Sequence, residues 1–149
     1  MITRREFVVL TCATASGAAP GAAFATQAAV NDALRTITGG AQVRRGRVKL
    51  DAPALIENGN SVVLGVTVES PMTQADYVKA IHVFAPMNPL PSMVSVHLGP
   101  RSGRAQFTTR ARVADTQTLM AVAEMSDGSF WSDQVSVVVT IAACLEELK

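Results

Sequence analysis

The stretch Val135-Ser136-Val137-Val138-Val139-Thr140-Ile141 carries the clearest fold signal in the chain. Its odd-numbered positions are all apolar and β-branched, whereas Ser136 and Thr140 interrupt the even-numbered positions. Successive side chains of a strand point to opposite faces, and β-branched residues fit a pleated, half-buried surface. The stretch therefore predicts a strand with one face turned into a core.

Similar patterns recur upstream and predict an all-β fold. We expect further strands at residues 43–50, 62–68, 79–85, 93–98, 105–113 and 118–125. Turn signals separate them, among them Asn58-Gly59 and Ser126-Asp127-Gly128-Ser129. Residues 86–91 contain three prolines, which lack backbone donors, and are expected to form a loop. About seven strands at roughly 8–12-residue spacing predict an immunoglobulin-like antiparallel β-sandwich, with Trp131 as its central packing residue.

The segment before these strands predicts a short helix. Val30, Leu34 and Ile37 recur at helical spacing, and Gly39-Gly40 follows as a stop signal. The expected organisation is an N-terminal helical segment at 26–42, a sandwich domain at 43–141 and a C-terminal arm at 142–149. A chain of 149 residues suits one such domain.

Residues 1–25 have the parts of an export signal. Arg4-Arg5 precede a mildly apolar stretch, and Ala23-Phe24-Ala25 ends it. The paired arginines favour the twin-arginine route, and hence a periplasmic protein. An ordinary amphipathic N-terminal helix is the alternative interpretation.

Charge argues against nucleic acid as a partner, and hydropathy argues against a membrane span. Eleven basic and eleven acidic residues remain after residue 25, so the basic excess that nucleic-acid binding needs is absent. The local run of Arg44, Arg45, Arg47 and Lys49 is expected to protect a strand edge. No apolar run reaches the roughly 18 residues of a membrane span.

The sequence contains none of the usual catalytic motifs, such as G-x-S-x-G or H-E-x-x-H. A blue-copper site would draw on His82, His97, Cys144 and a methionine, namely Met72, Met87 or Met93. In such sites Cys, His and Met share one loop, and here no His or Met follows Cys144. We therefore expect no metal and no cofactor. A Cys/His nucleophile pair is a weaker alternative.

Cys144 is the remaining candidate, because Cys12 lies in the signal segment. An unpaired cysteine in an exported protein indicates an intermolecular bond or a reactive thiol, although a buried, inert cysteine explains it equally well. The thiolate is the reactive form, and the nearby Glu146 and Glu147 should disfavour it. Such a thiol would suit a carrier whose partner enzymes supply the activation.

Several motifs in one order resemble the SoxY family, the carrier subunit of bacterial thiosulfate oxidation. They are Glu57-Asn58-Gly59-Asn60, Val68-Glu69-Ser70-Pro71-Met72, Ile81-His82-Val83-Phe84, Asn88-Pro89-Leu90-Pro91, His97-Leu98-Gly99-Pro100-Arg101-Ser102-Gly103-Arg104 and Ala123-Glu124-Met125-Ser126-Asp127-Gly128-Ser129-Phe130-Trp131. The resemblance covers essentially the whole chain, including the twin-arginine signal.

The resemblance implies a non-enzymatic role with defined partners. SoxY proteins are immunoglobulin-like, pair with SoxZ as a heterodimer, and carry sulfur covalently on a cysteine near the C-terminus. By position, Cys144 matches that cysteine. A cytochrome-type partner, SoxXA, attaches thiosulfate, the hydrolase SoxB releases sulfate, and a sulfur dehydrogenase oxidises the remaining sulfur.

The arm departs from the family pattern, which is typically Gly-Gly-Cys-Gly-Gly. Here Ala142, Ala143, Leu145 and Glu146 surround Cys144, and alanine lacks the wide φ/ψ range of glycine. The arm is then either stiffer, or adapted to other sulfur compounds, or part of a non-carrying module that only binds a SoxZ-like protein.

Overall fold

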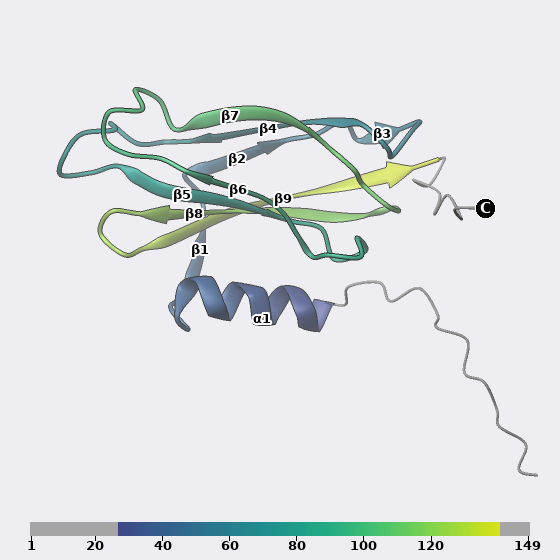
Figure 1. Cartoon of the computed structure of the whole chain (residues 1–149), viewed down its shortest axis with the longest axis horizontal. Helices are drawn as coiled ribbons and strands as arrows, with labels where there is room; N and C mark the ends of the chain where they lie inside the picture. The colour runs from purple at the N-terminus through teal and green to yellow at the C-terminus, as the bar shows by residue number, and fades with distance from the viewer. Residues whose placement is uncertain (1–26, 141–149) are drawn as a thin grey trace, which may run out of the picture.

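The computed structural model describes residues 27–140, which form two packed β-sheets and one helix (Figure 1). The larger sheet has the order β1-β9-β8-β5-β6, and β3 also pairs with β9. Its strands are β1 (Val43–Arg45), β3 (Leu55–Ile56), β5 (Val78–Phe84), β6 (Ser92–His97), β8 (Gln117–Met125) and β9 (Phe130–Val139). The smaller sheet has the order β2-β4-β7, with β2 (Val48–Asp51), β4 (Val62–Val68) and β7 (Gln106–Ala111).

The two sheets enclose the main core, as expected for a β-sandwich. Strand β4 alternates as predicted, with its even-numbered side chains buried from Val62 to Val68. Leu64, Ile81 and Leu119 are fully buried at the centre of the cluster that the two sheets share. Burial of this apolar surface drives the sheets together. The immunoglobulin-like sandwich is thereby confirmed, with the addition that β1 and β3 pair with β9 in parallel.

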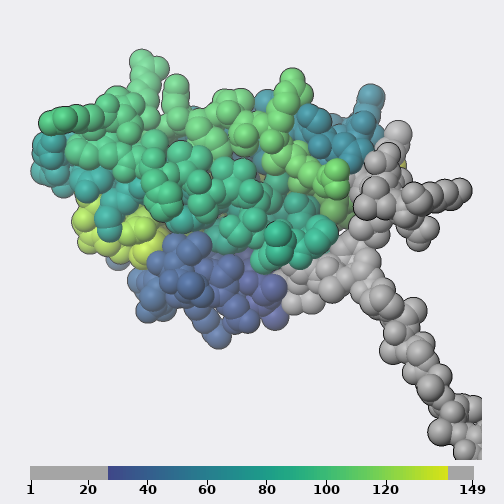
Figure 2. Space-filling view, viewed as in Figure 1, coloured from purple at the N-terminus to yellow at the C-terminus, as the bar shows by residue number. Residues whose placement is uncertain are grey.

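Helix α1 (Gln27–Thr38) covers the outer face of the larger sheet. Val30 is buried against Phe84, Val122 and Phe130, and Leu34 and Ile37 pack on the same cluster. In the space-filling view the helix lies directly against the sandwich (Figure 2). The predicted helix and its apolar face are confirmed, and Gly39 and Gly40 end it with positive φ angles. No helix of the described residues is long and apolar enough to cross a membrane.

One predicted strand was wrong. Residues 43–50 form two strands, and the chain passes from the larger sheet at β1 to the smaller sheet at β2. Gly46 and Arg47, between them, have φ angles of 119° and 57°. Positive φ values interrupt a strand, and apolar periodicity gives no sign of them.

The basic run lies along this crossing, as predicted for strand edges. Arg44 and Arg45 lie on β1, at one edge of the larger sheet, and Lys49 lies on β2, at one edge of the smaller sheet. All three side chains are exposed. Charged side chains on edge strands disfavour pairing with another chain.

The expectation that Trp131 is the central packing residue was also wrong. Its side chain is only partly buried at the margin of the core, where the Arg44 and Arg47 guanidinium groups lie 5.7 and 5.8 Å from the ring centroid. Phe130 points the other way and packs under helix α1. The two aromatic residues stand at the start of β9, so neither lies over the sheet centre.

Candidate functional site

The predicted carrier residue Cys144 lies outside the described residues, four positions after Thr140, the last residue that the structure describes. The Thr140 backbone N–H donates to the Ile56 carbonyl at 2.9 Å, and the Val138 N–H donates to the Ala54 carbonyl at 2.9 Å. The Val139 N–H donates to Thr116 Oγ1 at 3.0 Å. The end of β9 is thus held by β3 on one side and by the β7–β8 connection on the other.

Apolar side chains lie exposed around the end of β9. We call Leu55 and Val138 the exit patch, and their exposed fractions are 59% and 51%. Leu55 and Val138 are register partners in the parallel β3–β9 pair, so both point to the same side. Leu55 and Val63 line one shallow hollow of about 450 Å³, together with Ile56 and Glu57.

A cation stands beside Val63, which lines this hollow. Arg110 on β7 is the register partner of Val63 on β4, so their side chains share the outer face of the smaller sheet. The Arg110 side chain is exposed and takes part in none of the ion pairs among the described residues. The Arg110 guanidinium thus lies beside the exposed apolar side chain of Val63.

The two histidines lie together on the helix-facing side of the larger sheet, with ring centroids 6.2 Å apart. His82 is buried, and its Nδ1 and Ser95 Oγ share a hydrogen bond of 2.8 Å. Burial lowers the pKa of His82, and the neighbouring His97 lowers it further. Within residues 27–140 no three His, Cys, Asp or Glu side chains gather as metal ligands. Neither histidine lies near the end of β9, since both belong to the opposite side of the sheet order.

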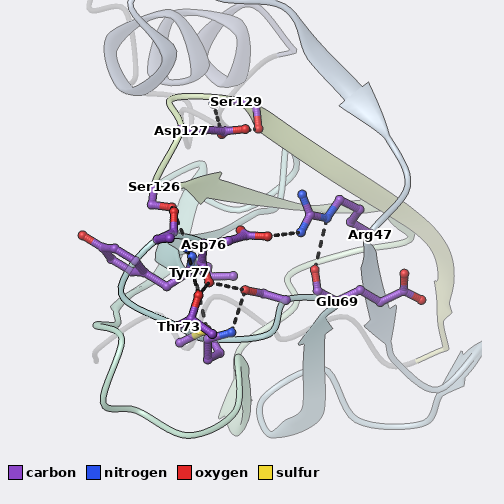
Figure 3. Close-up of polar contacts among 12 residues, drawn as sticks. Arg47, Glu69, Thr73, Asp76, Tyr77, Ser126, Asp127 and Ser129 are labelled. Atoms are coloured by element: carbon purple, nitrogen blue, oxygen red, sulfur yellow. Dashed lines mark hydrogen bonds and ion pairs between the residues drawn. The ribbon is translucent and has the colours of Figure 1, made fainter.

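The opposite end of the sandwich is a network of loop contacts (Figure 3). Arg47 Nε donates to the Glu69 carbonyl at 3.1 Å, and its guanidinium forms an ion pair with Asp76 at 3.6 Å. Hydrogen bonds from the hydroxyl and N–H of Ser129 lower the pKa of Asp127. These contacts fasten the loops to one another.

A groove runs between the free edges of the two sheets. It has a volume of about 380 Å³ and is lined by residues of β6, β7 and the preceding loop, including Leu90, Met93, Val94 and Arg112. Val94 packs against the core from the edge strand β6 and is only partly buried.

The family of the chain follows from its sequence match. The model of the family described as sulfur oxidation protein SoxY matches residues 34–144. The chain belongs to the SoxY family. This confirms the resemblance and supports a sulfur-oxidation carrier role. The matched range begins in helix α1, spans the whole sandwich, and ends at Cys144.

Solved structures agree with the family match. The sulfur carrier protein SoxY from Chlorobium limicola f thiosulfatophilum is similar, with a TM-score of 0.65 and 26% identity over 76% of this chain and 98% of that chain. Superoxide reductase (neelaredoxin) from Ignicoccus hospitalis has a TM-score of 0.56 at 18% identity, covering 63% of this chain and 80% of that one. A putative superoxide reductase from Thermotoga maritima has a TM-score of 0.55 at 18% identity, covering 67% and 89% respectively. These two share the fold alone. No curated protein matches the sequence.

Sequence reasoning missed the exit patch. The strand β3 contains only Leu55 and Ile56, too short for a periodic signal, and its partner Val138 lies more than 80 residues further along the chain. Pro53 before it and Asn58-Gly59 after it are turn signals that bracket a short extended segment, and they are the one local indication.

Proposed function

We propose that this SoxY-family chain is a periplasmic carrier that holds sulfur intermediates of thiosulfate oxidation covalently on Cys144. The observation that carries the proposal is the family match, which extends to Cys144 and ends there. The similar structure from Chlorobium limicola is itself named a sulfur carrier protein. Because Cys12 falls in the segment that we expect to be removed on export, Cys144 is the thiol available to the mature chain.

The chemistry of a thiol suits reversible carriage. In loading, the Cys144 thiol loses its proton and bonds to the outer sulfur of thiosulfate, while two electrons pass to a cytochrome-type partner of the SoxXA kind. Water then cleaves the sulfur–sulfonate bond on a SoxB-like hydrolase, releasing sulfate and leaving a persulfide on Cys144. The outer persulfide sulfur is then oxidised to a sulfonate, with three oxygens from water and six electrons passed to a sulfur dehydrogenase, and a second hydrolysis on the SoxB-like enzyme releases sulfate and restores the Cys144 thiol. Sulfur–sulfur bonds form and break through a thiolate, which suits such a cycle.

The described geometry supports presentation of that thiol to other proteins. Thr140 is hydrogen-bonded to β3, and Cys144 follows it by four residues. At about 3.3–3.6 Å per residue, the thiol can stand up to about 14 Å beyond this anchor. A few residues that follow an anchored strand are long enough to place a bound substrate inside another protein's active site.

The proposed carrier would be exported to the periplasm and would pair there with a second subunit. The Arg4-Arg5 signal would direct the folded chain to the periplasm by the twin-arginine route. A SoxZ-like subunit would be its stable partner, and a sulfur dehydrogenase would oxidise the sulfur that remains after sulfate release. The fusion of residues 1–30 to a reporter that is active only after folded export tests the route, with Arg4→Lys and Arg5→Lys together as the control that should retain the reporter in the cytoplasm.

The carriage itself is tested in vitro. The mature chain is incubated with thiosulfate, a SoxZ-like subunit and an oxidising cytochrome of the SoxXA type, and its intact mass is measured. We expect one thiosulfate adduct, removed by a reducing agent and absent from Cys144→Ser. Arg35→Ala is the control, because Arg35 lies on the exposed side of helix α1 and should leave loading unchanged.

A second candidate function is a non-carrying module that binds a SoxZ-like protein. The groove between the free edges of β6 and β7 favours it, because edge strands and apolar grooves are common protein-binding surfaces. It predicts a stable complex that Cys144→Ser leaves intact and an unmodified thiol under all loading conditions.

A further inference from the structure

The edge of the sandwich between β6 and β7, which we call the open edge, leaves the core incompletely covered. Among the described strands, β6 pairs with β5 alone and β7 with β4 alone, so each is the outer strand of its sheet. Phe107 on β7 is the register partner of the buried Val66 and therefore faces inward, as does Ala111 four residues on. Both are nevertheless only partly buried, as is Val94 on β6. Apolar core side chains are thus accessible through the open edge.

The groove of about 380 Å³ lies at one end of the open edge and has a fixed wall. Leu90 lines it and is 75% exposed. Asn88 fastens the loop that carries Leu90, because its Nδ2 donates to the Arg112 carbonyl at 2.8 Å and its Oδ1 accepts from the Ala114 N–H at 2.9 Å. Asn88 is itself buried, so the loop is held against the end of β7. The groove is therefore formed before a partner binds, which lowers the entropic cost of binding.

Positive charge collects along the open edge. Residues 80–114 contain four arginines and no aspartate or glutamate. Arg110 and Arg112 line the groove, whereas Arg101 and Arg104 belong to the loop that joins the other ends of β6 and β7. All four are exposed, and none takes part in the ion pairs found among the described residues. Two guanidinium groups beside an apolar groove suit a ligand that has both carboxylates and apolar side chains.

The spacing of the two groove arginines specifies the spacing of the ligand. Exposure alternates from Arg110 to Val113, so Arg110 and Arg112 share the outer side of the chain and Ala111 faces inward between them. A segment that adds to β7 as a further strand places its own alternate residues opposite these. Two carboxylates would then stand opposite the two arginines, with one apolar side chain between them directed toward the core.

Strand β7 lacks the features that keep edge strands unpaired. Such strands commonly carry prolines or inward-pointing charged side chains. β7 contains no proline, and its inward-facing residues Phe107, Thr109 and Ala111 are uncharged. The edge of β7 is therefore suited to accept another strand.

We propose that the open edge binds an extended segment of another protein in which two acidic residues flank one apolar residue. The segment adds to β7 as a strand, its carboxylates bind Arg110 and Arg112, and its apolar side chain enters the groove beside Leu90. A second copy of this chain does not supply such a segment, because no two acidic residues of its sequence stand two positions apart. The inference goes beyond the proposed function, since it does not depend on sulfur carriage by Cys144.

The test measures the binding of fluorescein-labelled peptides to the mature chain by fluorescence anisotropy. The probe is Thr-Val-Glu-Val-Glu-Val-Thr, and the matched control, Thr-Val-Val-Glu-Glu-Val-Thr, has the same composition with adjacent acids. We expect saturable binding of the probe and binding of the control that is about fivefold weaker. Arg110→Glu/Arg112→Glu should weaken binding of the probe about tenfold. Arg101→Glu/Arg104→Glu makes the same change in net charge away from the groove and should weaken it by no more than about twofold.

A charge-swapped peptide and hydrogen exchange complete the experiment. Thr-Val-Lys-Val-Lys-Val-Thr should bind Arg110→Glu/Arg112→Glu more tightly than it binds the native chain, which also shows that the variant is folded. Amide exchange in residues 106–111 should slow when the probe is bound, because an added strand protects the edge of β7. Absence of saturable probe binding, or unchanged exchange in residues 106–111, would overturn the proposal. So would equal binding of the two glutamate peptides or equal losses in the two arginine variants, because the edge would then attract any anion.

Discussion

At the scale of single residues, His82 shows how burial sets chemistry in this protein. Its side chain lies on the helix-facing side of the larger sheet, is 6% exposed and is hydrogen-bonded to Ser95. Burial is the main cause of its lowered pKa and His97 the second, while Glu124 acts in the opposite direction. Removal from water disfavours the charged imidazolium, so the fold favours neutral His82.

His82 therefore makes the folded state sensitive to acid. Below its ordinary pKa of 6.5 the unfolded chain binds a proton that the folded chain does not, so the free energy of unfolding falls as the pH falls from 6.5 to the lowered value. The loss is at most about 1.4 kcal/mol per pH unit for one proton. In His82→Gln, urea unfolding at pH 8, 6.5 and 5.5 should show a shallower decrease than in the native chain. A parallel decrease in both proteins would contradict this account.

Trp131 shows what residue type alone cannot predict. A lone tryptophan in a small β protein is expected in the core. Trp131 instead lies near the start of β9, with the guanidinium groups of two arginines over its ring. Arg44 and Arg47 come from the β1–β2 crossing, so their position over the ring depends on a change of sheet that the local sequence does not reveal. The central residues are aliphatic instead, among them Leu64 and Leu119.

At the scale of elements, the crossing from β1 to β2 depends on the backbone of two residues. Gly46 and Arg47 both have positive φ, and together they carry the chain from one sheet to the other. The periodic strands 62–68 and 118–125 were predictable, because burial on one face fixes alternation. The crossing was not predictable, because it depends on backbone angles rather than on apolar pattern.

Gly46→Ala should destabilise the fold by about 1–3 kcal/mol, the cost of a strained backbone region. The added Cβ would meet Trp131 at 3.6 Å, an ordinary contact, so the cost comes from the φ of 119°. Gly65→Ala is the matched control, since its Cβ would meet Asp51 at 3.6 Å without a positive φ. Chemical denaturation should show a clear loss for Gly46→Ala and less than about 1 kcal/mol for Gly65→Ala. Equal losses would show that crowding, not backbone angle, matters at both sites.

Helix α1 should contribute to the stability of the sandwich rather than act as a separate appendage. Val30 on helix α1 is 1% exposed and packs in the cluster that contains Phe84. Val30→Ala removes two methyl groups from this cluster and should lower the free energy of unfolding by about 2 kcal/mol. Arg35→Ala, on the exposed side, should stay within about 0.5 kcal/mol of the native chain. Both free energies can be measured by denaturation followed by Trp131 fluorescence. If Val30→Ala unfolds with unchanged midpoint, the helix does not belong to the cooperative unit.

At the scale of the whole molecule, the sandwich holds two ends of different character. The β8–β9 turn, the β1–β2 crossing and the loop before β5 meet in polar contacts at one end, and the exit patch lies where β9 finishes beside β3 (Figure 1). The sequence predicted the sandwich, its helix and its basic edges from local pattern. The carrier residue Cys144 came from the family resemblance, and the exit patch required the pairing of Leu55 with Val138, two residues far apart in sequence.

Sulfur carriage on Cys144 can be tested directly in the native host. The most direct measurement is the intact mass of the mature protein purified without reducing agent from its native host grown on thiosulfate. We predict a population with sulfur or thiosulfate adducts that peptide fragmentation places on Cys144 and that reductant removes, and none in cells grown without a reduced sulfur source. A thiol of unmodified mass under both conditions, with the partner enzymes present and active, would contradict the carrier account.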